Sequence, residues 1–280
     1  MLTTASAITF LGLFVSQLSA LSGMPWRFIA TSFFITLIAG CAAGIVTTPG
    51  AALALAGLLL AALSHHLAVR PSARSWRTPC IVLLALLALA LGFHAVPGFK
   101  PQVLMNDFGR DAAHTLTWHA DKGIGGLLLL MACANSPRTR DYRRLIAMLM
   151  LCPAVLTSAA LLGGIATLDP RWLSGSAMWL LGNLFLTIVA EEVFFRGLLQ
   201  QRLGHWLQAR WACGPWPAIA FVALLFAAVH APWGLGFAIG AGLAGVLYGA
   251  LHEHGGLRWA IAGHAISNAA LLVLTRSPLG

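Results

Sequence analysis

The sequence predicts an all-α, polytopic integral membrane protein with about 8–10 transmembrane helices, since one span needs about 20 apolar residues. Three observations indicate this fold class. Of the 280 residues, 59% are hydrophobic and only 9% are charged, whereas soluble domains carry roughly 25% charged residues. The mean hydropathy is +0.84. Long apolar runs recur along the whole chain, and a soluble protein could not keep that much apolar surface away from water.

Ten apolar segments have a length and composition that favour helices in a bilayer. Two are weaker than the rest. Segment 50–68 is compatible with a re-entrant helix as well as a span, and segment 121–134 is short for a span. The ten expected helices are 2–22, 28–46, 50–68, 79–96, 121–134, 144–167, 175–200, 216–231, 235–251 and 259–275.

The net charge of +9 has an explanation in membrane topology. Of the 17 Lys and Arg residues, twelve fall in the odd-numbered connections between these segments and five in the even-numbered connections and the tail. The positive-inside bias therefore predicts cytoplasmic odd-numbered connections and both termini outside. Basic and aromatic residues do not interleave as they do on nucleic-acid-binding surfaces. We expect the lipid bilayer as a partner and no nucleic acid.

The chain divides by content at about residue 170. Residues 1–170 are read as N-terminal transmembrane helices with a long loop at 97–122, and residues 171–280 hold the polar motifs described below. The loop is expected to be interfacial, with Asp121 and Lys122 forming a local ion pair. Segment 198–211 is basic and amphipathic, which is typical of a helix lying on the membrane surface. Three histidines flank the loop and receive no role: His94, His114 and His119.

The stretch "AEEVFFRG" at 190–197 places three charges in an apolar region. Ionisable groups inside a membrane are costly and tend to be functional. Glu192 and Arg196 are four residues apart, so on an α-helix they share a face and are expected to form a salt bridge. Glu191 then points elsewhere.

Two further segments repeat this spacing. Phe226 and His230 are four residues apart, and so are His264 and Asn268. A carboxylate can take a proton from water while a His orients that water. A second His and an Asn amide can donate hydrogen bonds to an oxyanion. The set therefore favours hydrolysis.

A metal is the alternative reading of the same residues. Glu191, His230 and His264 are also chemically suited to hold zinc, which would then activate the water. The nearby "HEHG" at 252–255 lacks the spacing of a zinc-protease helix motif and is expected to be a solvated turn. Each motif alone is typical of packing, of a structural clamp or of a proton-coupled transporter.

The three motifs taken together resemble the CPBP family of intramembrane proteases. Glu191-Glu192-x-x-x-Arg196, Phe226-x-x-x-His230 and His264-x-x-x-Asn268 carry the resemblance, and "GVLYGALHEHGGLRWAIAGHAISNAA" resembles the family's approach to its third motif. That family includes CAAX prenyl endopeptidases and bacterial proteins linked to bacteriocin self-immunity. The resemblance covers 175–275 and implies that 171–280 is a CPBP-type, CAAX-protease-like catalytic core.

The resemblance implies roles for each residue. Glu191 and His230 activate water, His264 and Asn268 stabilise the oxyanion, and Glu192, Arg196 and Phe226 organise the site. It favours a glutamic-type mechanism with no cofactor, with a divalent metal such as zinc as the alternative. The expected substrate is a membrane-anchored protein or peptide, including one with a C-terminal sorting tail, at the inner membrane of a bacterium. The competing function is a non-catalytic membrane partner or bacteriocin immunity protein of the same fold.

Overall fold

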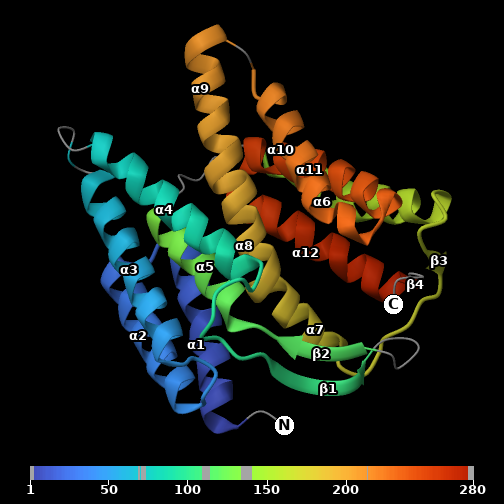
Figure 1. The fold of residues 1–280 in the computed structure, drawn as a ribbon. Helices are drawn as coiled ribbons and strands as arrows, with labels where there is room; N and C mark the ends of the chain where they lie inside the picture. Colours follow the sequence, from blue (N-terminus) through green and yellow to red (C-terminus); the bar gives the residue numbers. More distant parts are fainter. Residues whose placement is uncertain are drawn as a thin grey trace. The chain divides into compact units, whose positions relative to one another are not determined.

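A computed structural model describes residues 3–68, 70, 74–108, 114–133, 141–212 and 214–276. The described chain is mainly helical, with two small two-stranded sheets (Figure 1). Eight of its helices are long and apolar enough to cross a membrane. Apolar side chains that would be costly in water are exposed on them, among them Leu59 at 71% and Leu224 at 70%, as expected for surfaces that face lipid. The fold class predicted from composition is confirmed.

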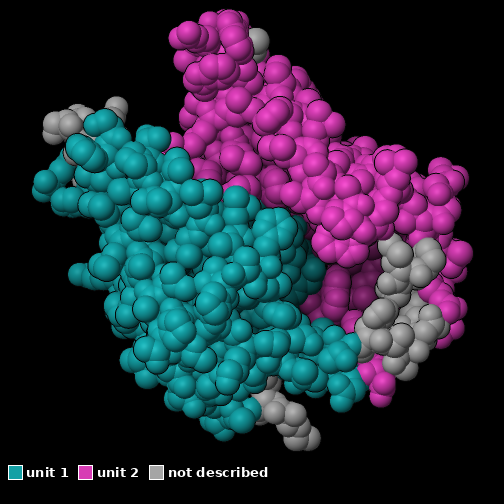
Figure 2. Space-filling model, in the orientation of Figure 1, with its two compact units in different colours: residues 1–106, 115–134, 181–193 teal, residues 107–114, 135–180, 194–280 magenta. Residues whose placement is uncertain are grey.

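The chain forms two compact units, which Figure 2 colours separately. Unit 1 comprises residues 1–106, 115–134 and 181–193, and unit 2 comprises residues 107–114, 135–180 and 194–280. The sequence analysis separates N-terminal helices, 1–170, from a catalytic core, 171–280. That functional division stays a prediction.

Unit 1 is built on five N-terminal helices. They are α1 (Thr4–Leu21), α2 (Trp26–Ala42), α3 (Thr48–Ala68), α4 (Arg74–Gly92) and α5 (Ala120–Ala132). Segment 50–68, which was compatible with a re-entrant helix, is part of a 21-residue helix that is long enough to span. At the chain start, the Thr3 side chain accepts a hydrogen bond from the Ser6 backbone N–H and caps α1.

The short helix α5 is the buried centre of unit 1. It has 13 residues, and all of them except Lys122 are buried. It packs against α1, α3, α4 and the short helix α8 (Val189–Glu192). A helix of 10–14 apolar residues is more often a buried core helix than a span. The expected helix at 121–134 is therefore present, but it lies within the protein.

The loop expected at 97–122 contains a β-hairpin. Strands β1 (Gln102–Phe108) and β2 (His114–Trp118) pair as a two-stranded sheet, and α5 begins directly after it. The end of β2 is fixed by aromatic packing, because the Trp118 ring lies edge-on to Phe10 at 5.0 Å and to Phe14 at 5.5 Å between ring centroids. The hairpin thus holds the start of α5 in a defined position.

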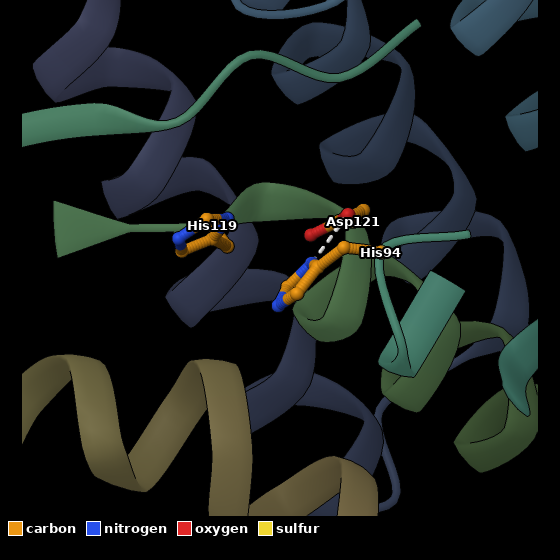
Figure 3. Close-up of side chains that lie close together, drawn as sticks. All are labelled: His94, His119 and Asp121. Atoms are coloured by element: carbon orange, nitrogen blue, oxygen red, sulfur yellow. Dashed lines mark hydrogen bonds and ion pairs between the residues drawn. The ribbon is translucent and has the colours of Figure 1, made fainter. Parts of the chain in front are cut away.

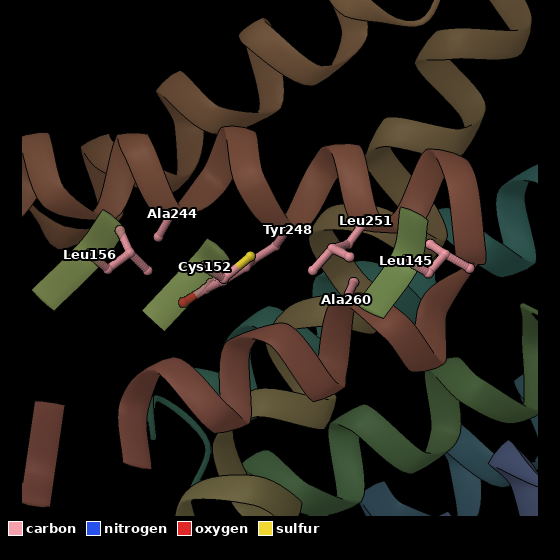
Figure 4. Packing of buried hydrophobic residues seen from close by; sticks show 7 residues of the cluster. All are labelled: Leu145, Cys152, Leu156, Ala244, Tyr248, Leu251 and Ala260. Atoms are coloured by element: carbon pink, nitrogen blue, oxygen red, sulfur yellow. The ribbon is translucent and has the colours of Figure 1, made fainter. Parts of the chain in front are cut away.

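Unit 2 is built on helices α6 (Tyr142–Leu162), α10 (Trp216–His230), α11 (Leu235–Gly255) and α12 (Leu257–Leu274). Their core contains side chains from α6, α11 and α12, drawn in Figure 4. The members are Leu145, Cys152, Leu156, Ala244, Tyr248, Leu251 and Ala260. The short strands β3 (Thr167–Leu168) and β4 (Thr275–Arg276) pair antiparallel and tie the end of α12 to the chain after α6.

One helical stretch of 36 residues, Ser176–Trp211, contributes residues to both units. It consists of α7 (Ser176–Gly182), the π-helical η2 (Asn183–Ile188), α8, the π-helical η3 (Val193–Gln200) and α9 (Gln201–Trp211). Residues 198–211 continue the preceding helix, and their expected place on the membrane surface stays a prediction. The stretch also reaches beyond the expected end at 200.

Candidate active site

The carboxylate of Glu191 lies in α8 and is held by a lysine. Lys122 Nζ donates a hydrogen bond to Glu191 Oε1 over 2.7 Å, and the two side chains are 23% and 16% exposed. Lys122 is in the first turn of α5, far from Glu191 in sequence. A charge-assisted hydrogen bond of this kind is shorter and stronger than one between neutral groups.

A glycine in α5 allows this contact. Gly126 is one helical turn after Lys122, and a Cβ built on it would lie 2.7 Å from the Cα of Ala190. Any larger residue would therefore push α5 away from α8. Because Ala190 directly precedes Glu191, the close approach at Gly126 brings the Lys122 amine within reach of the carboxylate.

Glu192 and Arg196 are both fully buried, at 0% exposure. Glu192 belongs to unit 1 and Arg196 to unit 2. The helix is π-helical from Val193 to Gln200, so the α-helical spacing used to pair these two residues does not apply unchanged. Their salt bridge stays a prediction.

The guanidinium of Arg196 lies among aromatic rings of unit 2. Its Cζ is 4.8 Å from the centre of the Phe226 ring and 5.8 Å from those of Phe195 and Tyr248. Arg196 Nη2 also approaches the carbonyl oxygen of Gly245 at 3.5 Å. Cation–π attraction is strongest for such a desolvated cation. The sequence thus stabilises a buried charge with ring faces.

His230 ends α10, and its orientation is set by its own helix. The His230 Nδ1 lies 2.7 Å from the carbonyl oxygen of Phe226. A carbonyl oxygen only accepts, so Nδ1 carries the proton and Nε2 of the neutral ring keeps its lone pair. The ring also packs against Phe226 at 4.4 Å and Trp233 at 5.7 Å between centroids. This geometry leaves Nε2 as the basic atom.

His264 is buried in α12 between two rings. It stacks on Tyr248 with centroids 4.6 Å apart and planes at 19°, and it lies edge-on to Phe226 at 6.1 Å. Only 6% of His264 is exposed. Asn268 follows one helical turn later in α12 and is partly buried.

Phe226 is the residue around which these unit 2 groups gather. Its ring contacts Arg196, His230 and His264. Residues from η3, α10 and α12, which the sequence separates widely, thus share one aromatic neighbour. Within its own unit, Glu191 is placed by Lys122.

Sequence reasoning missed two residues that position this set. Lys122 was expected to pair with Asp121, but its amine bonds Glu191, and Asp121 instead bonds His94. Tyr248 was not singled out, although it stacks on His264. For Lys122 the sequence did offer a signal, because a lone lysine at the start of an apolar helix is costly in a membrane and tends to be functional.

The "HEHG" stretch is also corrected. It was expected to be a solvated turn, but it forms the last turn of α11, where His252 is only 3% exposed. The helix continues until Gly256, whose φ of +87° ends it.

Residues 173–270 match the family model described as type II CAAX prenyl endopeptidase, Rce1-like. These residues form an Rce1-like domain. The matched range covers about a third of the chain and includes all three polar motifs. No curated protein and no solved structure matches the chain.

At the level of the family, the Rce1-like domain is a CAAX-type intramembrane protease domain. With eight helices suited to spanning among the described residues, the chain is an integral membrane protein, and the family matched at 173–270 indicates a protease that acts on a peptide or protein in a membrane. The matched range agrees with the resemblance expected over 175–275.

Proposed function

We propose that this protein is an intramembrane endopeptidase that hydrolyses a peptide bond of a membrane-associated protein or peptide with water activated by Glu191 and His230. The observation that carries the proposal is the gathering of Arg196, His230 and His264 around Phe226 within the Rce1-like range. Three separate motifs that meet on one ring are better explained by a shared site than by independent packing.

Glu191 acts as the general base. The Lys122 amine donates a hydrogen bond to its Oε1 over 2.7 Å and fixes the carboxylate in place, where it accepts a proton from water. His230 Nε2, with its lone pair free, accepts a hydrogen bond from the same water and orients it. The water oxygen bonds to the scissile carbonyl carbon as its proton passes to Glu191.

His264 and Asn268 stabilise the charge that this attack creates. The electron pair of the carbonyl bond moves to its oxygen, and the imidazole N–H and the amide N–H donate hydrogen bonds to that oxyanion. The carbon–nitrogen bond then breaks, and the proton held by Glu191 passes to the leaving amine. Stacking on Tyr248 fixes the plane of the His264 ring before substrate binds.

Glu192, Arg196 and Phe226 organise the site. Arg196 and Glu192 are fully buried charges, and buried charges are retained only where their surroundings compensate them. Phe226 supports Arg196 through its ring face and His230 through its backbone carbonyl. These three residues hold the reacting groups in place and do not themselves exchange protons with the substrate.

The proposed mechanism uses no metal. Glu191, His230 and His264 have the chemistry of zinc ligands. However, the Lys122 ammonium already neutralises the Glu191 carboxylate, and a zinc ion bound to that carboxylate would be repelled by the nearby ammonium. The lysine supports the glutamic-type mechanism over the zinc alternative.

The proposal extends to substrate and location. The substrate class is a membrane-anchored chain of the kind that prenyl proteases cut, including one that ends in a C-terminal sorting tail. The place of action is the inner membrane of a bacterium. The resemblance of the motifs supports both statements.

The test compares wild type with Glu191→Gln in the native host, by membrane proteomics of N- and C-terminal fragments. Glu253→Gln is the matched control, because it is the one glutamate outside the pair. Fragments that appear with wild type and Glu253→Gln, and not with Glu191→Gln, would support the protease and identify its substrate. Identical fragment sets from equally expressed proteins would favour a non-catalytic partner or immunity protein.

A further inference from the structure

Three side chains outside the Rce1-like domain converge at the start of α5. His94 follows the end of α4, His119 lies between β2 and α5, and Asp121 is in the first turn of α5 (Figure 3). One potential ligand atom from each lies within 4.8 Å of the other two. Among the residues that the structure describes, these three form the one group of His, Cys, Asp or Glu side chains close enough together to hold a metal ion.

The contacts inside the cluster are close. His94 Nδ1 lies 2.8 Å from Asp121 Oδ2, and the centroids of the His94 and His119 rings are 4.3 Å apart. The second oxygen of Asp121 accepts a hydrogen bond from the Lys122 backbone N–H at 2.9 Å. Two imidazoles and one carboxylate thus share a small volume.

The turn that ends α4 at its C-terminus holds His94 in an unusual backbone conformation. The Ala95 N–H bonds the Ala90 carbonyl and the His94 N–H bonds the Leu91 carbonyl, so the helix ends in a Schellman motif. His94 is the residue of this motif with positive φ, at +54°, where glycine is usual because other residues are strained there. A histidine at this position aims its ring at Asp121 in spite of that strain.

The cluster has one buried side and one open side. The Asp121 side chain is 5% exposed, whereas that of His94 is 44% exposed. Burial, and next the nearby His94, lower the pKa of His119, while Asp121 acts in the opposite direction. Because His94 is partly exposed while Asp121 is buried, solvent water can reach the cluster from the His94 side.

We propose that His94, His119 and Asp121 bind a divalent transition-metal ion of the zinc class. Two imidazoles and a carboxylate, with water as a further ligand, form a donor set that zinc uses in proteins. Ligand atoms of one tetrahedral zinc lie about 3.4 Å apart, given bonds of about 2.1 Å. The ligand atoms here all lie within 4.8 Å of one another, and side-chain rotation covers the remaining difference.

The simpler explanation is a hydrogen-bonded His94–Asp121 pair with no ion. That pair accounts for two of the three side chains. It does not account for His119, whose ring lies against His94 rather than in a separate packing site. A shared ion explains why ligand atoms of both imidazoles and of the carboxylate all lie within 4.8 Å of one another.

The proposed ion has a structural consequence. His94 belongs to the end of α4, while His119 and Asp121 belong to the start of α5, so the ion would join the two helices. The next residue, Lys122, holds Glu191. The proposed metal site therefore uses none of the motif residues, and its ligand Asp121 directly precedes the lysine that positions Glu191.

The test measures zinc binding by the full-length protein in detergent, purified through a tag without histidine. The protein is stripped with a chelator, dialysed and titrated with Zn²⁺ by calorimetry, and its metal content after desalting is measured by mass spectrometry. The variants are His94→Gln and His119→Gln. His66→Gln, an exposed histidine in α3, is the matched control. His230→Gln reports whether the catalytic motif holds the ion instead.

We expect one ion per chain in wild type, His66→Gln and His230→Gln. Each cluster variant should bind at least about tenfold more weakly, since even outer partners of a metal ligand change affinity by this factor. Visible absorption of the Co²⁺-loaded wild type, lost in His94→Gln, would independently report the ligand set. Equal binding by wild type and His94→Gln, or loss in His230→Gln alone, would overturn the proposal. Melting temperatures close to wild type show that the variants are folded, and all these measurements are independent of proteolysis.

Discussion

Lys122 Nζ and Glu191 Oε1 lie 2.7 Å apart although 69 positions separate the two residues in the sequence. The lysine comes from α5, the buried centre of unit 1, and the glutamate from α8. Both side chains are mostly buried, so the hydrogen bond is little screened by water. The proposed general base therefore depends on a residue outside the Rce1-like range.

Replacing Lys122 by Met removes the ammonium and leaves a side chain of similar length. A hydrogen bond to a charged group contributes about 1.5–3 kcal/mol, so kcat should fall about 10- to 100-fold. KM should change little, because the lysine holds the base rather than the substrate. Cleavage kinetics on the substrate identified by proteomics measure both constants.

Two further variants distinguish positioning from folding. Lys122→Arg keeps the charge and should recover part of kcat. Lys100→Met removes the other lysine of the chain, which is exposed, and should leave kcat unchanged. A Lys122→Met protein with wild-type kcat would show that the contact has no part in catalysis.

Gly126→Val tests the approach of α5 to α8. A Cβ at this position would meet the Ala190 backbone at 2.7 Å, and overpacking of this kind costs about 1–3 kcal/mol. The melting temperature should fall, and activity should fall with it because Lys122 moves away from Glu191. Gly214→Val adds the same side chain where no atom lies within 4 Å of the new Cβ. Equal melting temperatures for Gly126→Val and wild type would contradict the packing argument.

Each of the ten helices predicted from hydropathy corresponds to a helical segment among the described residues, because apolar runs of this length have few other solutions in a bilayer. Hydropathy did not predict where each helix begins and ends, or which helical segments join into one longer helix. The expected helix 79–96 begins earlier and ends earlier, as Arg74–Gly92. The helix through Glu191 extends to Trp211, with π-helical stretches that no hydrophobic pattern encodes.

The strands and the long-range pairs were also missed. The alternation in "HTLTW" was a signal for β2, but the hairpin lay in a region read as a loop. The Lys122–Glu191 and His94–Asp121 contacts join distant segments, and helix packing decides such pairs. The three motifs could be found in the sequence because the paired residues of each stand four positions apart; the roles assigned to them stay predictions.

Phe226→Leu tests the aromatic centre of unit 2. The change keeps an apolar side chain but removes the ring that faces Arg196 at 4.8 Å and His230 at 4.4 Å. Loss of a desolvated cation–π contact costs about 2 kcal/mol, so the protein should melt at a lower temperature and lose most of its activity.

The matched control for this change is Phe221→Leu, on the same helix but 53% exposed. It should melt and cleave like wild type. Phe226→Tyr keeps the ring and should retain more activity than Phe226→Leu. Equal activity of Phe226→Leu and Phe221→Leu would show that the ring does not organise the site.

Chelation separates the glutamic-type mechanism from the zinc alternative. The experiment uses His94→Gln, because this variant lacks the metal site proposed at the start of α5 and any remaining metal effect then reports on Glu191, His230 and His264. Treatment with a strong zinc chelator should leave its cleavage rate unchanged, since the Lys122 ammonium at 2.7 Å supplies the positive charge beside the Glu191 carboxylate. The rate is measured on the same preparation before and after treatment, so any effect of the substitution itself cancels. If chelation abolishes cleavage and added zinc restores it, the catalytic groups hold a metal and the role assigned to Lys122 is wrong.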